Sequence, residues 1–170
     1  RAMNLCFDVF GADGMTSSKF IGLLRKHDLV LQTADESFRW SHQLVAGALA
    51  SRHLALNWRQ HLRSLEQALA DDAWIFAIRH VPKEDLDDFL RELFLADLML
   101  GAKATAELPL GERELSLPYI EKALQTGQPE GLQVSGFFAL AKVGTDSAMS
   151  FLREVAGDRR DEYGCVAARA

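Results

Sequence analysis

Between residues 37 and 56 the spacing of apolar side chains changes from a period of two to a helical period, which strongly constrains the fold. Phe38, Trp40 and His42 alternate with polar residues, as in a half-buried strand. Helical spacing begins after Ser41, whose hydroxyl can cap a helix by accepting a hydrogen bond from the first turn. The sequence therefore predicts a short strand that leads directly into a long helix. His42 lies at the N-terminus of that helix, where backbone N–H groups favour an anion.

The residues before this stretch predict two helices and a β-hairpin. Residues 3–10 have the pattern of the end of an apolar helix, and a second helix ends at His27–Asp28. Residues 29–32 and 37–40 are strand candidates, and residues 33–36 form the turn between them. Helix, hairpin and helix in this order are typical of the end of a winged-helix unit, in which the hairpin is the wing.

From His42 onward the sequence predicts helices almost throughout, with a break at Asn57–Trp58. Pro82 begins a helix with a wide apolar stripe and an acidic outer face. Gly and Pro residues mark 101–116 as the clearest linker. We therefore predict a mainly α protein whose parts are the end of a winged-helix domain with its wing and exit helix (1–56), a helical linker or bundle (57–100), a loop (101–116) and truncated HEAT-like repeats of an α-solenoid (117–170).

An internal repeat supports the last of these parts. Residues of similar character recur at an offset of 31, and each predicted unit is a pair of antiparallel helices. Such pairs cannot bury their apolar faces alone, so they stack on their neighbours as a solenoid. The segment 139–146 resembles the helix end of a HEAT repeat. The recurring pairs are Leu117 and Ala148, Ile120 and Phe151, Leu124 and Val155, Leu132 and Tyr163, and Ala139 and Ala170.

Charge and composition narrow the classes of function. A formal net charge of −5 argues against a general nucleic-acid binder. The charge is uneven, because residues 16–66 carry seven Lys/Arg against four Asp/Glu and residues 71–114 carry five against eleven.

Cys6 and Cys165 are far apart and have apolar neighbours, which predicts reduced thiols in a cytoplasmic protein. No segment approaches the roughly 20 apolar residues of a membrane span. The helical pattern at the C-terminus has no stop signal, so we expect a longer polypeptide.

The run Phe38-Arg39-Trp40-Ser41-His42, followed by the apolar helix from Leu44 to Ala55, resembles the signature that closes the winged-helix domain of NACHT-type STAND NTPases. Proteins of that class place a helical-repeat sensor after this domain. The resemblance makes Phe38, Trp40 and Ser41 structural signature residues. It implies that His42 reaches the β-phosphate of ADP and helps to hold a closed, inactive state. It further implies an upstream NTPase domain in cis with ADP or ATP and Mg²⁺, and it allows oligomerisation of the parent.

The chain departs from this family in two respects. Residues 46–48 read Ala-Gly-Ala where the family usually has Gln-Glu-aromatic. The phosphate-binding loop G-x-x-x-x-G-K-[ST] does not occur in the sequence. We therefore expect no cofactor and no catalytic residue in this chain, and no enzymatic activity of its own.

Other candidate sites have weaker patterns. His53, Asn57 and His61 follow helical spacing, which could bring two imidazoles near one metal ion, but no third strong ligand is evident and we predict no metal site. Ser41 and His42 are adjacent, so their side chains point apart and do not form a catalytic pair. The acidic residues from Glu84 to Glu92 are typical of a solvated helix face.

Three functions remain open. The first is a non-catalytic regulatory segment of a NACHT-like NTPase, in which His42 senses nucleotide and the helical repeats bind a protein partner. The second is a free-standing helical-repeat scaffold for a protein partner. The third is a winged-helix DNA-binding module using Lys19, Arg25 and Lys26, against which the acidic neighbouring segment argues. No membrane partner is expected.

Overall fold

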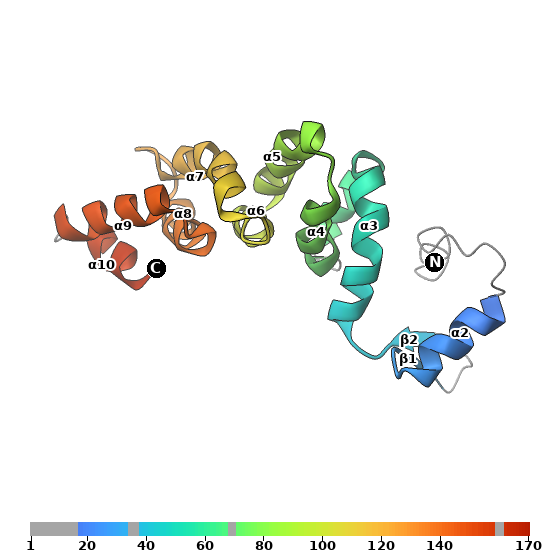
Figure 1. The fold of residues 1–170 in the computed structure, drawn as a ribbon. Helices are drawn as coiled ribbons and strands as arrows, with labels where there is room; N and C mark the ends of the chain where they lie inside the picture. The colour runs from blue at the N-terminus through green and yellow to red at the C-terminus, as the bar shows by residue number, and fades with distance from the viewer. Residues whose placement is uncertain (1–16, 34–37, 68–70, 159–161) are drawn as a thin grey trace. The chain divides into compact units, whose positions relative to one another are not determined.

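The computed structural model describes residues 17–33, 38–67, 71–158 and 162–170. The chain divides into two compact units, unit 1 (residues 1–80) and unit 2 (residues 81–170). The protein is mainly α, as predicted, and its described strands form one two-stranded sheet (Figure 1). The predicted helix end at residues 3–10 and most of the hairpin turn lie outside the described residues.

Unit 1 begins with the predicted helix and hairpin. Helix α2 (Ser17–Lys26) is followed by strands β1 (Val30–Gln32) and β2 (Phe38–Trp40), which pair antiparallel. Asp28 ends the helical run with φ of 53°, a left-handed conformation that Asp tolerates better than most residues. The amide of Leu29 donates to the carbonyl of Leu24 at 2.9 Å, which ties the first strand to the helix. The predicted hairpin is therefore confirmed.

The exit helix α3 (Gln43–His61) is kinked at Asn57, where φ is −126° and ψ is 18°. The Asn57 side-chain amide donates to the carbonyl of His53 at 3.0 Å. That carbonyl would otherwise accept the backbone N–H of Asn57, so the side chain competes with the helical hydrogen bond. The break predicted at Asn57–Trp58 is thus a kink within one helix.

Helix α4 (Asp71–Ala77) packs closely against α3. A Cβ atom at Gly47 would lie 2.7 Å from Cβ of Asp72, so a glycine is needed where the two helices approach. Trp74 and Ala77 are almost completely buried in this contact region. Unit 1 also contains the 3₁₀ helices η1 (Leu62–Gln67) and η2 (Ile78–His80).

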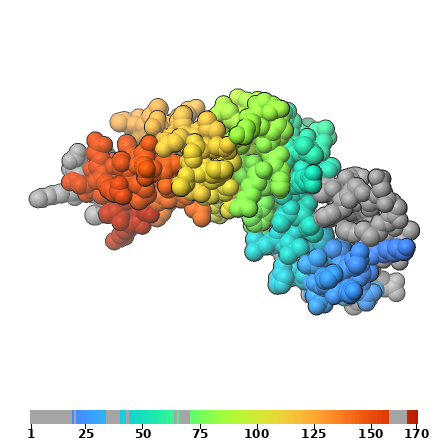
Figure 2. All heavy atoms as spheres, viewed as in Figure 1, coloured from blue at the N-terminus to red at the C-terminus, as the bar shows by residue number. Residues whose placement is uncertain are grey.

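Unit 2 is an array of helices that follow one another in chain order. In Figures 1 and 2 the colour of this unit passes from green through yellow to red along the array. Most helices pack on their neighbours in sequence, and α6 packs on α8. The elements are η3 (Lys83–Asp85), α5 (Leu86–Ala96), α6 (Leu98–Thr105), η4 (Leu110–Ser116), α7 (Leu117–Leu124), α8 (Glu130–Val143), α9 (Asp146–Asp158) and α10 (Glu162–Arg169).

The segment 101–116 differs from the predicted loop. Residues up to Thr105 continue α6, and most of the remainder is the 3₁₀ helix η4. Gly101 is not a turn residue: a Cβ atom there would lie 2.6 Å from the ring of Phe94, so the glycine permits close packing of α5 on α6. Pro109 precedes η4 as its N-cap. Glycine and proline are typical of loops in a sequence, but here Gly101 allows close packing and Pro109 starts a helix.

Arg113 donates hydrogen bonds to three backbone carbonyls of unit 2. Its guanidinium donates to the carbonyls of Ala106 at 2.7 Å, Leu108 at 2.9 Å and Val143 at 3.1 Å. Two of these carbonyls lie at the C-terminal ends of α6 and α8, where unpaired carbonyls carry partial negative charge. A planar fork of donors can satisfy several carbonyls at once, which suits arginine and not lysine.

Helices α7 and α9 have a similar order of buried and exposed residues. This order fits an offset of 32 residues better than the predicted 31. Ile120 is 0% exposed and corresponds in burial to Leu152 at 4%, whereas Phe151 is 39% exposed. Residue types alone did not distinguish these registers, because leucine and phenylalanine are adjacent in α9. The common core of α6 to α10 includes Ile120, Phe137, Leu140, Val143 and Leu152.

Candidate functional site

His42 is the N-cap residue of α3, with an extended backbone (φ −135°, ψ 131°). Its side chain is exposed, and it makes no capping hydrogen bond. The prediction that Ser41 caps the helix is therefore wrong by one residue. The Ser41 amide instead donates to the carbonyl of Leu29 at 3.0 Å, and its hydroxyl has no partner among the described residues. The extension of strand-like pairing to Ser41 delays the start of the helix.

The other signature residues lie on the hairpin. Phe38 pairs in register with Gln32, and Trp40 pairs with the buried Val30. The Trp40 side chain is half-buried. The hairpin thus presents His42 to solvent at the point where β2 gives way to α3. An exposed imidazole in this position can meet a ligand that approaches from outside unit 1.

The predicted histidine pair is close in space. The rings of His53 and His61 lie 5.8 Å apart between centroids, inclined by 58°. Within the part of the chain that the structure describes, no three or more His, Cys, Asp or Glu residues are grouped to hold a metal ion. The basic residues considered for DNA binding, Lys19, Arg25 and Lys26, are exposed on α2.

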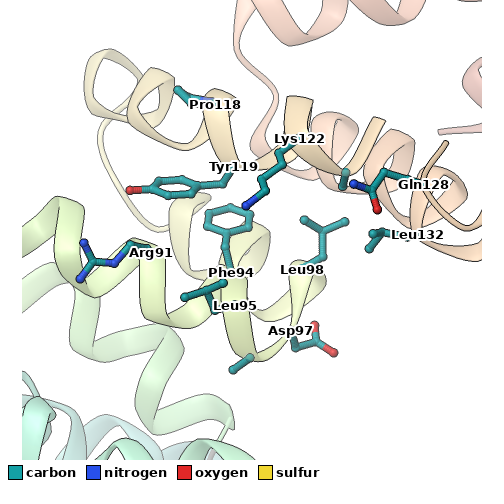
Figure 3. Close-up of a pocket in the computed structure, with 12 residues that line it drawn as sticks. Arg91, Phe94, Leu95, Asp97, Leu98, Pro118, Tyr119, Lys122, Gln128 and Leu132 are labelled. Carbon is teal, nitrogen blue, oxygen red and sulfur yellow. The ribbon is translucent and has the colours of Figure 1, made fainter. Parts of the chain in front are cut away.

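An apolar groove in unit 2 was not predicted. It has a volume of about 770 Å³ and lies between the C-terminal half of α5, the start of α6, and α7 with the turn after it. Figure 3 shows its aromatic floor and the aliphatic side chains on either side. The signal in the sequence is Leu95, an apolar residue outside the buried stripe of α5. The residues that line the groove are Arg91, Phe94, Leu95, Ala96, Asp97, Leu98, Pro118, Tyr119, Lys122, Ala123, Gln128 and Leu132.

The floor of the groove is a stacked aromatic pair. The rings of Phe94 and Tyr119 lie 5.4 Å apart and are nearly parallel, at 12°. The Tyr119 hydroxyl donates to a carboxylate oxygen of Asp87 at 2.8 Å. Burial and this hydrogen bond to a carboxylate raise the pKa of Tyr119 to about 12. The phenol is therefore a neutral donor over the whole physiological pH range.

Charged groups surround the apolar floor. Arg91 pairs with Asp88 at 2.9 Å and with Glu92 at 3.5 Å. Asp97 caps α6, because its carboxylate accepts the Leu100 amide at 2.7 Å. Lys122 extends from α7 toward the groove (Figure 3). The arrangement is suited to binding an apolar surface with charged flanks and presents no nucleophile with an activating base.

The fold and these sites define the class as a mainly α-helical array with a β-hairpin in its N-terminal unit. No family model matches the chain, and neither a curated protein nor a solved structure matches it. Within the described ranges, no helix is both long and apolar enough to cross a membrane.

Proposed function

We propose that the chain is a regulatory, non-catalytic segment of a cytoplasmic NACHT-type STAND NTPase. In this proposal His42 senses the nucleotide held by an upstream NTPase domain, and the helical array of unit 2 binds a protein partner. The segment couples the two events and carries out no chemistry of its own.

The observation that carries the proposal is the exposure of His42 at the N-cap of α3. Its imidazole has no capping role, so it is available to donate a hydrogen bond to a phosphate oxygen. The first-turn N–H groups of α3 also point toward this end of the helix and favour an anion. A β-phosphate would therefore meet both kinds of donor at one place.

A contact between His42 and ADP can regulate the protein only if it forms in one conformational state and not in the other. If the His42 contact with ADP forms in the closed state alone, ADP stabilises that state by the free energy of the contact. Loss of the contact then shifts the population toward the open state. A charge-assisted hydrogen bond of about 1.5–3 kcal/mol corresponds to roughly tenfold to hundredfold in this equilibrium.

The test is His42→Ala in the full-length parent. We expect at least about tenfold weaker retention of ADP and a higher basal activity. His27→Ala is the matched control, because His27 is also exposed and lies outside the junction of β2 and α3. ADP retention in His42→Ala equal to that in the control would contradict the sensing role. The alanine is compatible with the helix start, since the His42 side chain does not cap it.

The groove of unit 2 also favours a second candidate, a free-standing helical scaffold for a protein partner. The two proposals differ in what is encoded before Arg1. An open reading frame that continues upstream into a phosphate-binding loop supports the regulatory segment. A start codon near Met3 supports the scaffold.

A further inference from the structure

The groove of unit 2 exposes apolar side chains that no described element covers. Leu95 is 69% exposed and Leu132 is 36% exposed, and these residues come from α5 and α8. Phe94 and Leu98 are half-buried between them. The volume of about 770 Å³ is suited to a few side chains from one face of a helix, a common mode of peptide recognition.

The floor is held in place before any ligand binds. The Phe94 ring lies against the backbone of α6 at Gly101 and stacks on Tyr119. Asp87 fixes the Tyr119 hydroxyl at 2.8 Å. Binding to such a floor requires little ordering of side chains, so more of the contact energy remains as affinity.

The lining of the groove carries the cations Arg91 and Lys122 and one carboxylate, and the acidic excess lies on the residues beside it. Asp97 lines the groove itself, and Asp87, Asp88 and Glu92 each contact a lining residue, Tyr119 or Arg91. The cations are Arg91 and Lys122, and Arg91 is already paired with Asp88 and Glu92. Four carboxylates against two cations give a local net charge of −2. The side chains of Asp88 and Glu92 remain 44% and 30% exposed, so a partner can reach them.

We propose that this groove binds one amphipathic helix of a partner protein, with apolar residues on the face that enters the groove and Lys or Arg residues on its flanks. The inference rests on the partner-binding part of the proposed function and names the chemistry of the partner. Electrostatic complementarity favours a basic helix over an acidic one. A second copy of the chain, with a formal net charge of −5, is less complementary to an acidic surface.

The test uses the 170-residue chain and three labelled synthetic peptides of about 14 residues. The first has Leu and Phe at helical spacing with Lys at the remaining positions, the second has Glu in place of Lys, and the third is a scrambled form of the first. Fluorescence anisotropy measures each affinity. We expect the first peptide to bind at least about tenfold more tightly than the other two. Equal or tighter binding of the acidic or the scrambled peptide, or no binding of the first, would overturn the proposal.

Matched variants localise the binding. Leu95→Ser should weaken the first peptide about tenfold, whereas Leu110→Ser should leave it unchanged, because Leu110 is similarly exposed (64%) but does not line the groove. Asp88→Asn combined with Glu92→Gln should lower the affinity for the first peptide and reduce the salt dependence of that affinity. The control combines Glu84→Gln with Glu114→Gln, two exposed carboxylates outside the groove. Equal effects within either pair of variants would contradict the assignment.

Light scattering tests whether a second copy of the chain occupies the groove. A dimer of the unmodified chain that Leu95→Ser dissociates would identify a second copy as the occupant and overturn the partner helix. Failure of the peptide assay would not affect the His42 test, which measures ADP retention in the parent. The two proposals can therefore fail separately.

Discussion

The two candidate sites of this protein are built in different ways. His42 lies in one continuous stretch of the sequence, where β2 ends and α3 begins. The groove combines side chains from α5, α6, α7 and α8. A site of the first kind can be read from residue order, because neighbours in sequence determine the geometry. A site of the second kind forms only when helices pack together. The sequence shows its individual side chains but does not show that they lie close together in space.

The described cores of the two units also differ. In unit 1, the buried side chains include Trp58, Trp74 and several alanines. In unit 2, Phe89, Leu90 and Leu93 of α5 are completely buried. Because the chain divides into two compact units, we expect a core substitution in one unit to destabilise mainly that unit.

The largest expected effect tests this separation. Phe89→Ala should lower the free energy of unfolding of unit 2 by about 3–5 kcal/mol, because it removes a completely buried ring and leaves a cavity. Trp74→Ala should have an effect of similar size on unit 1. Denaturant unfolding followed by tryptophan fluorescence and by circular dichroism measures both.

Phe138→Ala is the control for Phe89→Ala, since Phe138 is 42% exposed in the same unit and its loss should cost much less. If each core variant shifts one transition and leaves another in place, the two units unfold separately. A single transition shifted equally by both core variants would show that the two units unfold together.

An intermediate effect is expected at Arg113, which has no counterpart among the described contacts of unit 1. Arg113→Met should destabilise unit 2 by about 1.5–3 kcal/mol, because three carbonyls lose a charged donor. Arg113→Lys should recover only part of this loss, since a single ammonium cannot reproduce the fork. Thermal and denaturant unfolding measure the change. Arg153→Met, at an exposed position of α9, is the control and should be nearly neutral.

The smallest expected effect is a titration. The pKa of Tyr119 is raised to about 12, first by burial and then by the hydrogen bond to Asp87. The folded state therefore holds the phenolic proton more tightly than the unfolded state, whose tyrosine titrates near 10. This contribution to stability is fully present below pH of about 10 and is lost as the pH rises toward about 12.

Tyrosinate absorbance of Tyr163→Phe, in which Tyr119 is the remaining tyrosine of two, should report this high pKa. Asp87→Asn should move the titration toward the ordinary value. An ordinary pKa in Tyr163→Phe would show that the aromatic floor is more open than the contacts with Asp87 and Phe94 indicate.

Much of the fold could be predicted from local patterns. The hairpin pairing, the end of α2 just before His27–Asp28 and the buried stripe of α5 followed from apolar spacing and turn residues. The cap at Ser41 was wrong by one residue, because the Ser41 amide pairs with Leu29 in the hairpin and the helix starts later. The segment 101–116 differed because Gly101 serves close packing on Phe94 and Pro109 starts a 3₁₀ helix.

The sequence by itself determined the helical class, the hairpin and the position of His42, since each depends on spacing over a few residues. Only the tertiary structure decided the groove, its acidic surroundings and the Arg113 contacts. Those features depend on which helix faces pack together, and packing is a property of the whole unit. Leu95 illustrates the difference: in the sequence it is an apolar residue outside the stripe of α5, and in the fold it lines the groove beside Phe94.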